Sequence, residues 1–128
     1  MKLKKLTAAC TLACATLFGA AAPAQAQISG DVIRIGIITD MSSLYADIDG
    51  PGGVEAIKMA IADAGGTVAG KKVEVLFADH QNKADIAAAK AREWFDTQGL
   101  DMLIGGTNSG TALAMAKVAK ETNTLLIV

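Results

Sequence analysis

The stretch "VIRIGIITD", residues 32–40, is rich in β-branched residues and is apolar at nearly every position. Such a composition predicts a strand that is buried on both faces, as strands of parallel sheets are. A polar, glycine-containing loop follows over residues 41–52, and residues 53–66 then read "GVEAIKMAIADAGG". Four apolar residues in that segment recur at helical spacing: Val54, Ile57, Ile61 and Ala64. The stretch and its surroundings therefore predict a strand, a loop and a helix, in that order.

The same strand–helix unit recurs along the rest of the chain. A second strand, "KKVEVLFAD" (71–79), precedes a helical segment over residues 83–99, and a third strand, "DMLIGG" (101–106), precedes another helical segment over residues 110–122. A fourth strand, "TLLIV", occupies residues 124–128. Alternation of this kind predicts an α/β fold with three layers, in which a mostly parallel, doubly wound sheet carries helices on both faces.

The first 26 residues have the three parts of a secretory signal peptide. A basic start, "MKLKK", precedes an apolar run from Leu6 to Ala22, and "AQA" at residues 24–26 forms a small-residue cleavage site. The apolar run is too short and too weakly apolar for the alternative, a membrane-spanning helix of about 20 residues. We therefore expect cleavage after Ala26, a mature part over residues 27–128, and a periplasmic or otherwise exported location.

Cleavage changes the charge and the cysteine content of the chain. Both cysteines, Cys10 and Cys14, leave with the signal, so neither a disulfide nor a cysteine metal site is expected. Loss of Lys2, Lys4 and Lys5 takes the formal net charge from −1 to −4. Since no basic patch with interleaved aromatic residues remains, the composition argues against a nucleic-acid partner.

Two glycine patterns imitate nucleotide-binding motifs. Residues 65–71 spell G-x-x-x-x-G-K, but Lys72 stands where a magnesium-binding Ser or Thr is needed, and the segment leads from a helix into a strand, the reverse of the required order. Residues 50–55, "GPGGVE", place Glu55 at the third glycine position of the dinucleotide motif. We expect neither to bind a nucleotide, and the sequence predicts no cofactor and no metal.

The sequence also lacks the residue pattern of a hydrolase. Ser109 follows a strand and opens a helix, but Thr107 and Thr111 occupy the glycine positions of a G-x-S-x-G elbow. His80 is the only histidine, and we expect its side chain to be solvated in a loop.

Ligands of doubly wound sheets bind beyond the carboxyl ends of the strands. Three loops are expected there, over residues 40–52, 79–83 and 105–110. In the last of them, "GGTNSG", the unpaired amides of Ser109, Gly110 and Thr111 would face an anion at the positive end of the helix dipole. No lysine is present, so a single carboxylate suits the loop better than a polyphosphate. The alternative is that Asn108 or Ser109 only caps the helix.

Residues 31–128 resemble, in order and without gaps, the start of a type I periplasmic solute-binding protein of ABC importers, in the leucine/isoleucine/valine-binding branch. Three segments carry the resemblance: "IRIGIITDMSSLYADIDGPGGVEAIKMAIADAGG", "KKVEVLFADHQNKADIAAAKAREW" and "DMLIGGTNSGTALAMAKVAKE". The resemblance implies that the chain is the N-terminal part of the first of two lobes, truncated after the fourth strand. It also implies that Asp79 shapes its loop rather than touching ligand.

The resemblance further implies where a ligand would be held. The third loop would bind a ligand carboxylate, chiefly through Ser109 and Gly110 with Asn108 and Thr111 beside them. The first loop would form a wall of the site, at the residues Ser42, Ser43 and Tyr45. Its "LYAD" segment is similar to members that take small organic acids other than amino acids, aromatic ones included.

The expected function is the capture of an amino acid or another small organic acid by a non-enzymatic receptor that delivers it to ABC permease subunits in the membrane. Two alternatives stay open: a ligand-sensing receptor lobe of the same fold, and a secreted doubly wound enzyme with Ser109 or Asp40 as a catalytic group.

Overall fold

The computed structural model describes residue 28 and residues 30–128, so the predicted signal peptide and its cleavage site lie outside the described residues. The elements, in chain order, are β1 (Val32–Thr39), α2 (Ala46–Asp49), α3 (Pro51–Asp63), β2 (Thr67–Val68), β3 (Lys71–Asp79), α4 (Ala84–Thr97), β4 (Met102–Ile104), α5 (Ser109–Glu121) and β5 (Leu125–Ile127).

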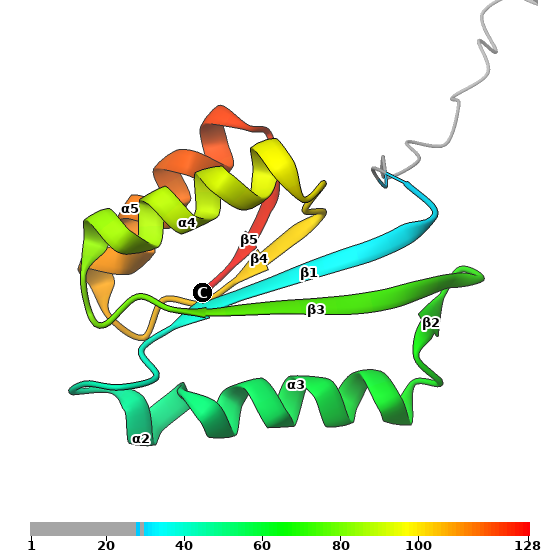
Figure 1. Cartoon of the computed structure of the whole chain (residues 1–128), viewed down its shortest axis with the longest axis horizontal. Helices are drawn as coiled ribbons and strands as arrows, with labels where there is room; N and C mark the ends of the chain where they lie inside the picture. Colours follow the sequence, from blue (N-terminus) through cyan, green and yellow to red (C-terminus); the bar gives the residue numbers. More distant parts are fainter. Residues whose placement is uncertain (1–27, 29) are drawn as a thin grey trace, which may run out of the picture.

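The strands form one sheet in the order β2-β3-β1-β4-β5. Strands β3, β1, β4 and β5 are parallel, and only the two-residue β2 runs antiparallel, as a hairpin with β3. Helix α3 lies on one face of the sheet, and α4 and α5 lie together on the other (Figure 1). This arrangement confirms the predicted three-layer, mostly parallel fold.

The core lies between the sheet and the α4–α5 layer. Ile38 of β1 and Leu103 of β4 are fully buried there against Met115 of α5. Helix α4 contributes Ala87, Ala91 and Trp94, which are buried at helical spacing. Trp94 packs on Gly36 of β1, where an added Cβ would lie 2.8 Å from the indole ring. Small residues on α4 and this glycine thus bring the helix close to the sheet.

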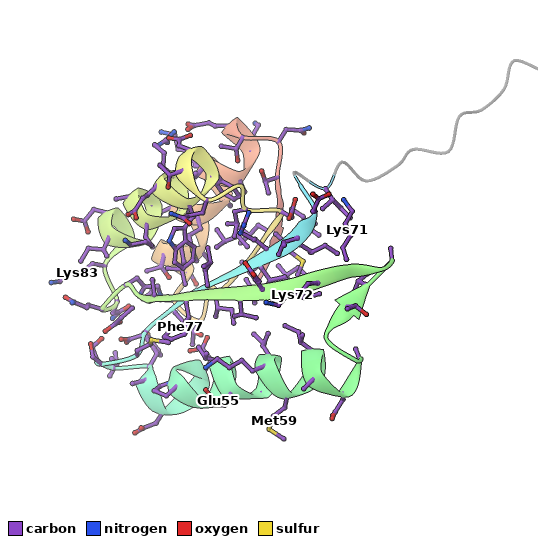
Figure 2. The ribbon with its side chains drawn as sticks, turned by 45° about the vertical axis from the view of Figure 1, so that its right-hand side comes forward. Glu55, Met59, Lys71, Lys72, Phe77 and Lys83 are labelled. Atoms are coloured by element: carbon purple, nitrogen blue, oxygen red, sulfur yellow. The ribbon has the colours of Figure 1, made fainter. Side chains whose placement is uncertain are left out.

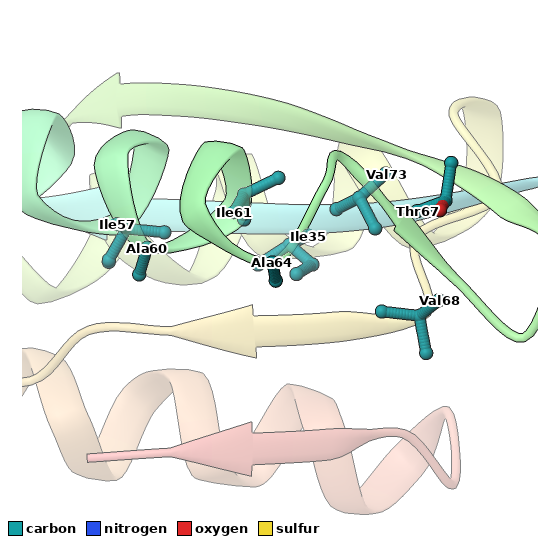
Figure 3. A pocket seen from close by; sticks show the side chains of 8 residues that line it. All are labelled: Ile35, Ile57, Ala60, Ile61, Ala64, Thr67, Val68 and Val73. Carbon is teal, nitrogen blue, oxygen red and sulfur yellow. The ribbon is translucent and has the colours of Figure 1, made fainter.

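Helix α3 covers the opposite face only in part. Val54 is buried, whereas Ile57 and Ile61 line an open apolar groove of about 210 Å³ between α3, β2 and the sheet (Figure 3). Ala64, predicted as part of the buried stripe, follows the last helical residue and is exposed. Met59 points away from the sheet, as Figure 2 shows, and is 66% exposed. Helix α3 therefore buries only a small part of its surface against the sheet.

Two short elements differ from the sequence prediction. The expected loop over residues 41–52 contains α2, and α3 already begins at Pro51, whose fixed φ suits the first position of a helix. The segment over residues 65–71, for which no strand was predicted before Lys71, contains β2, because Gly65, Gly66 and Gly70 adopt positive φ and fold the chain back on β3. This segment still leads from a helix into a strand, so it does not form a phosphate-binding loop.

Candidate functional site

The carboxyl ends of the parallel strands point to the same edge of the sheet, with α2 beside them (Figure 1). The loops that follow β1, β3 and β4 meet at this edge, which we call the carboxyl edge. The β1–β3 register sets Thr39 opposite Asp79, so the two loops after these strands begin side by side.

Two aspartates organise the loop that follows β1. Asp40 is fully buried and accepts hydrogen bonds from the Ser43 hydroxyl at 2.6 Å and from the amides of Ser43 and Tyr45, both at 2.9 Å. Asp79 accepts from the Ser42 hydroxyl at 2.5 Å and from the Met41 amide at 3.0 Å. The loop is thus folded around two carboxylates, and the expectation that Asp79 shapes it is consistent with these contacts.

The hydrogen bonds also set the charge of both carboxylates. Burial by itself raises the pKa of Asp40, but the hydroxyl of Ser43 and the surrounding amides outweigh it and hold that pKa below its ordinary value. For Asp79, burial and the charge of Asp40 raise the pKa, while the Ser42 hydroxyl and the amides of Met41 and Gln81 lower it, again with a net lowering. Both groups are ionised at neutral pH.

His80 contradicts the prediction of a solvated loop histidine, because its side chain is fully buried. Its Nδ1 accepts a hydrogen bond from the amide of Asn82 at 2.9 Å. Burial lowers the pKa of His80, and the charges of Asp40, Asp79 and Asp49 counter only part of that effect. The imidazole is therefore neutral at neutral pH, and it is packed in the interior at the carboxyl edge.

Acidification should destabilise the fold in two steps. Between the unfolded pKa of about 6.5 and the lower folded pKa of His80, the unfolded chain binds more protons, so the free energy of unfolding decreases as the pH is lowered, by up to about 1.4 kcal/mol per pH unit. Protonation of Asp40 and Asp79 also lowers the free energy of unfolding, but it does so only below about pH 4. Urea unfolding at several pH values would measure both steps. His80→Asn, whose amide oxygen can replace Nδ1 as acceptor, should lose the upper step alone; an unchanged upper step would assign it to another group.

The side chain of Asn108, in the loop after β4, caps α5. Asn108 is the residue before α5, and its Oδ1 accepts from the amides of Gly110 at 2.7 Å and Thr111 at 3.2 Å. These two amides are therefore not unpaired, contrary to expectation. Ser109 is the first helical residue, is exposed, and does not serve as the cap.

A further contact joins this loop to α2. The Thr107 hydroxyl donates a hydrogen bond to Oδ2 of Asp49, the last residue of α2. Both residues line a cavity of about 250 Å³ together with Ile104, Gly105, Gly106, Ile127 and Val128. The cavity thus combines one carboxylate and one hydroxyl with apolar side chains and glycine backbone.

The predicted site residues form two groups at the carboxyl edge. Ser42, Ser43 and Tyr45 gather around the two aspartates, while Asn108, Gly110 and Thr111 form the start of α5 with Ser109. None of them lines the cavity beside Asp49. Asp49 and Thr107 were missed because neither stands in a recognisable motif; their positions in the loops expected after the first and third strands were the only signal in the sequence.

The described part of the chain offers no metal centre, since no group of three His, Cys, Asp or Glu side chains within it is arranged around a common point. No helix formed by residues 30–128 has both the length and the hydropathy needed to cross a bilayer.

A doubly wound sheet that gathers its polar loops at the carboxyl edge is the arrangement of a ligand-binding lobe. A family model described as "Periplasmic binding protein" matches residues 32–128. The chain belongs to this periplasmic binding protein family, and the predicted resemblance is confirmed.

Solved structures agree with the family match. A periplasmic binding protein from Burkholderia mallei is 68% identical with a TM-score of 0.73, over 75% of this chain and 26% of that one. A branched-chain amino acid ABC transporter periplasmic ligand-binding protein from Burkholderia xenovorans is 46% identical with a TM-score of 0.70, over 73% and 25% of the two chains.

An ABC transporter solute-binding protein from Rhodopseudomonas palustris, solved with 3,4-dihydroxybenzoic acid, is 31% identical with a TM-score of 0.73, over 77% of this chain and 27% of that one. The chain thus spans about a quarter of the length of these relatives. No curated protein matches it.

Proposed function

We propose that the chain is part of the extracytoplasmic substrate-binding component of an ABC importer, and that it captures an amino acid or another small organic acid without being an enzyme. The observation that carries the proposal is the family match over residues 32–128. It is supported by the 46% identical relative, which is named as an ABC transporter ligand-binding protein. The buried His80 and the fully hydrogen-bonded Asp40 fit a receptor better than the enzyme alternative.

The relatives are about four times as long as the part that this chain matches. We propose that residues 27–128 form the first part of lobe 1, and that a second lobe closes over the ligand by a hinge motion. We call this chain, continued to the length of its relatives, the receptor-length protein.

Within this lobe the ligand carboxylate would lie at the N-terminus of α5. The side chain of Asn108 already accepts from the amides of Gly110 and Thr111, so an anion would instead meet the exposed Ser109 hydroxyl at the positive end of the helix dipole. Tyr45 would cover the apolar part of the ligand, since its ring offers a large contact area with a polar end.

Removal of the Ser109 hydroxyl should weaken ligand binding. In the receptor-length protein, Ser109→Ala would lose a hydrogen bond to a carboxylate, which costs about 1–3 kcal/mol. Calorimetric titration would measure this loss, and Ser109→Thr, which keeps the hydroxyl, is the matched control. Equal affinities of the Ala variant and the unaltered protein would reduce Ser109 to an ordinary first residue of the helix.

The ligand of the receptor-length protein has to be identified by experiment. A thermal-shift screen against amino acids, aromatic acids and short-chain acids would do so, because a ligand at 100 times its dissociation constant adds about 2.7 kcal/mol of stability. A screen in which no acid of any of these kinds raises the unfolding temperature would contradict the proposal. Permease and ATPase genes beside the gene would favour import, and a histidine kinase gene would favour the sensing alternative.

Export should remove residues 1–26. N-terminal sequencing of periplasmic material should begin at Gln27, because the small residues Ala24 and Ala26 fit the signal peptidase site. Exported protein that retained Met1 would contradict the proposed signal peptide.

A further inference from the structure

Three hydroxyl groups at the carboxyl edge share an arrangement that bears on the chemistry of the ligand. The hydroxyl of Ser42 donates to Asp79, that of Ser43 donates to Asp40, and that of Thr107 donates to Asp49. Each hydroxyl carries a single hydrogen, and in each case a carboxylate of the protein already holds it. The hydroxyl oxygens keep lone pairs, so toward any other molecule they can only accept.

The direction of the two serine hydrogen bonds is fixed by the charge of their partners. An ionised carboxylate has no hydrogen to give, so the serine must be the donor. Asp40 and Asp79 are held in this form by further donors: the amides of Ser43 and Tyr45 for Asp40, and the amide of Met41 for Asp79. Turning either hydroxyl away would remove one hydrogen bond from its carboxylate, Asp79 for Ser42 and Asp40 for Ser43.

Ser42 and Ser43 are exposed residues of the loop, so a ligand can approach them from solvent. The ion pairs formed among residues 30–128 include none of Asp40, Asp49 and Asp79. The wall made by the β1–α2 loop therefore combines hydrogen-bond acceptors with negative charge. A ligand carboxylate would be repelled by this wall, while an ammonium or hydroxyl group would be bound.

We propose that Asp40 and Asp79 act as specificity-setting positioning residues, which orient Ser42 and Ser43 so that the loop after β1 selects ligands bearing a hydrogen-bond donor in addition to their carboxylate. The inference rests on the proposed function, since it places the carboxylate at α5 and the donor at the β1–α2 loop. The donor is an ammonium group in an amino acid and a phenolic hydroxyl in a hydroxylated aromatic acid.

Two ligand pairs test the inference in the receptor-length protein. Leucine and 4-methylpentanoate differ by the ammonium group, and 4-hydroxybenzoate and benzoate differ by the phenolic hydroxyl. Calorimetry should show that the donor-bearing member of at least one pair binds more tightly, by about 10-fold to 100-fold for leucine, whose ammonium group is charged, or by about 2-fold to 10-fold for 4-hydroxybenzoate, whose phenolic hydroxyl is neutral. The pair that shows the difference identifies whether the protein selects an ammonium group or a phenolic hydroxyl.

Variants then locate the effect. Ser42→Ala and Ser43→Ala together should bring the affinity ratio within that pair toward one, while the Thr replacements, which keep the hydroxyls, should preserve it. Asp79→Asn should also lower the ratio, because an amide can donate to Ser42 and free its hydroxyl hydrogen. Ser109→Ala is the matched control, since it should weaken both members of the pair equally. A merely structural role would also change both affinities together and leave the ratio intact.

Three outcomes are distinguishable. Equal affinities within both pairs in the unaltered protein would overturn the inference while leaving the proposed function in place. A ratio that survived loss of both serine hydroxyls would also overturn it. Binding of none of the four acids, with no response in the wider acid screen, would contradict the proposed function and the inference together.

Discussion

Residues 27–128 on their own should associate in solution and should bind any ligand about 1000-fold more weakly than the receptor-length protein. Association is expected because β5 forms an edge of the sheet. Leu125, Ile127 and Val128 are 58%, 47% and 79% exposed along this edge. An apolar strand edge with unpaired backbone groups is a template for pairing with a second chain.

The expected loss of affinity rests on the proposed second lobe, which would supply about half of the ligand contacts. A ligand held at about 1 μM has a binding free energy of about −8.2 kcal/mol, and half of that corresponds to a dissociation constant of about 1 mM. Size-exclusion chromatography with light scattering would report association, and titration would report affinity. The variant Ile127→Lys places a charge on the edge and should reduce association without restoring affinity. A stable monomer of residues 27–128 with micromolar affinity would refute both parts of this prediction.

Replacement of Gly105 by alanine should destabilise the receptor-length protein by about 2–6 kcal/mol, the sum of backbone strain and overpacking. Gly105 has φ of 150°, a conformation that residues with a side chain rarely adopt. An added Cβ would lie 2.1 Å from the carbonyl oxygen of Ile38 and 3.3 Å from Met115. Neither neighbour can yield easily, because Ile38 and Met115 are fully buried in the core.

The matched control is Gly52→Ala, the same chemical change within α3, where an added Cβ meets nothing within 4 Å. It should leave stability unchanged or raise it by about 0.5–1 kcal/mol, the usual helical preference for alanine over glycine. Urea unfolding of both variants would measure the difference. Equal stabilities would show that the turn after β4 can rearrange to accept a side chain.

The burial of His80 shows why a side chain near the site was predicted wrongly. Residues 79–83 are polar, which locally indicates a solvated turn. In the fold, His80 follows β3 directly and its amide donates to the carbonyl oxygen of Thr39. Placement beside the buried end of β1 therefore decides its exposure, and β1 is about 40 positions away in the sequence.

The choice of helix cap shows a finer limit of the same kind. Asn108 and Ser109 are adjacent, and both residue types are favoured at the position before a helix. The extended backbone of Asn108, with φ of −96° and ψ of 127°, makes it the cap and makes Ser109 the first helical residue. Composition alone predicts that a cap is present, whereas the backbone path out of β4 decides which residue forms it.

The sequence by itself determined not the short elements α2 and β2 but the order of the four parallel strands and the three long helices, and with it the three loops at the carboxyl edge. These follow from the spacing of apolar residues and from glycines such as Gly65 and Gly99, which act on their near neighbours. Only the tertiary structure decided that Asp79 holds the Ser42 hydroxyl and that Asp49 holds that of Thr107, pairs separated by 37 and 58 positions. The physical reason is that a hydroxyl donates to the acceptor nearest in space, and the register of the sheet sets that distance.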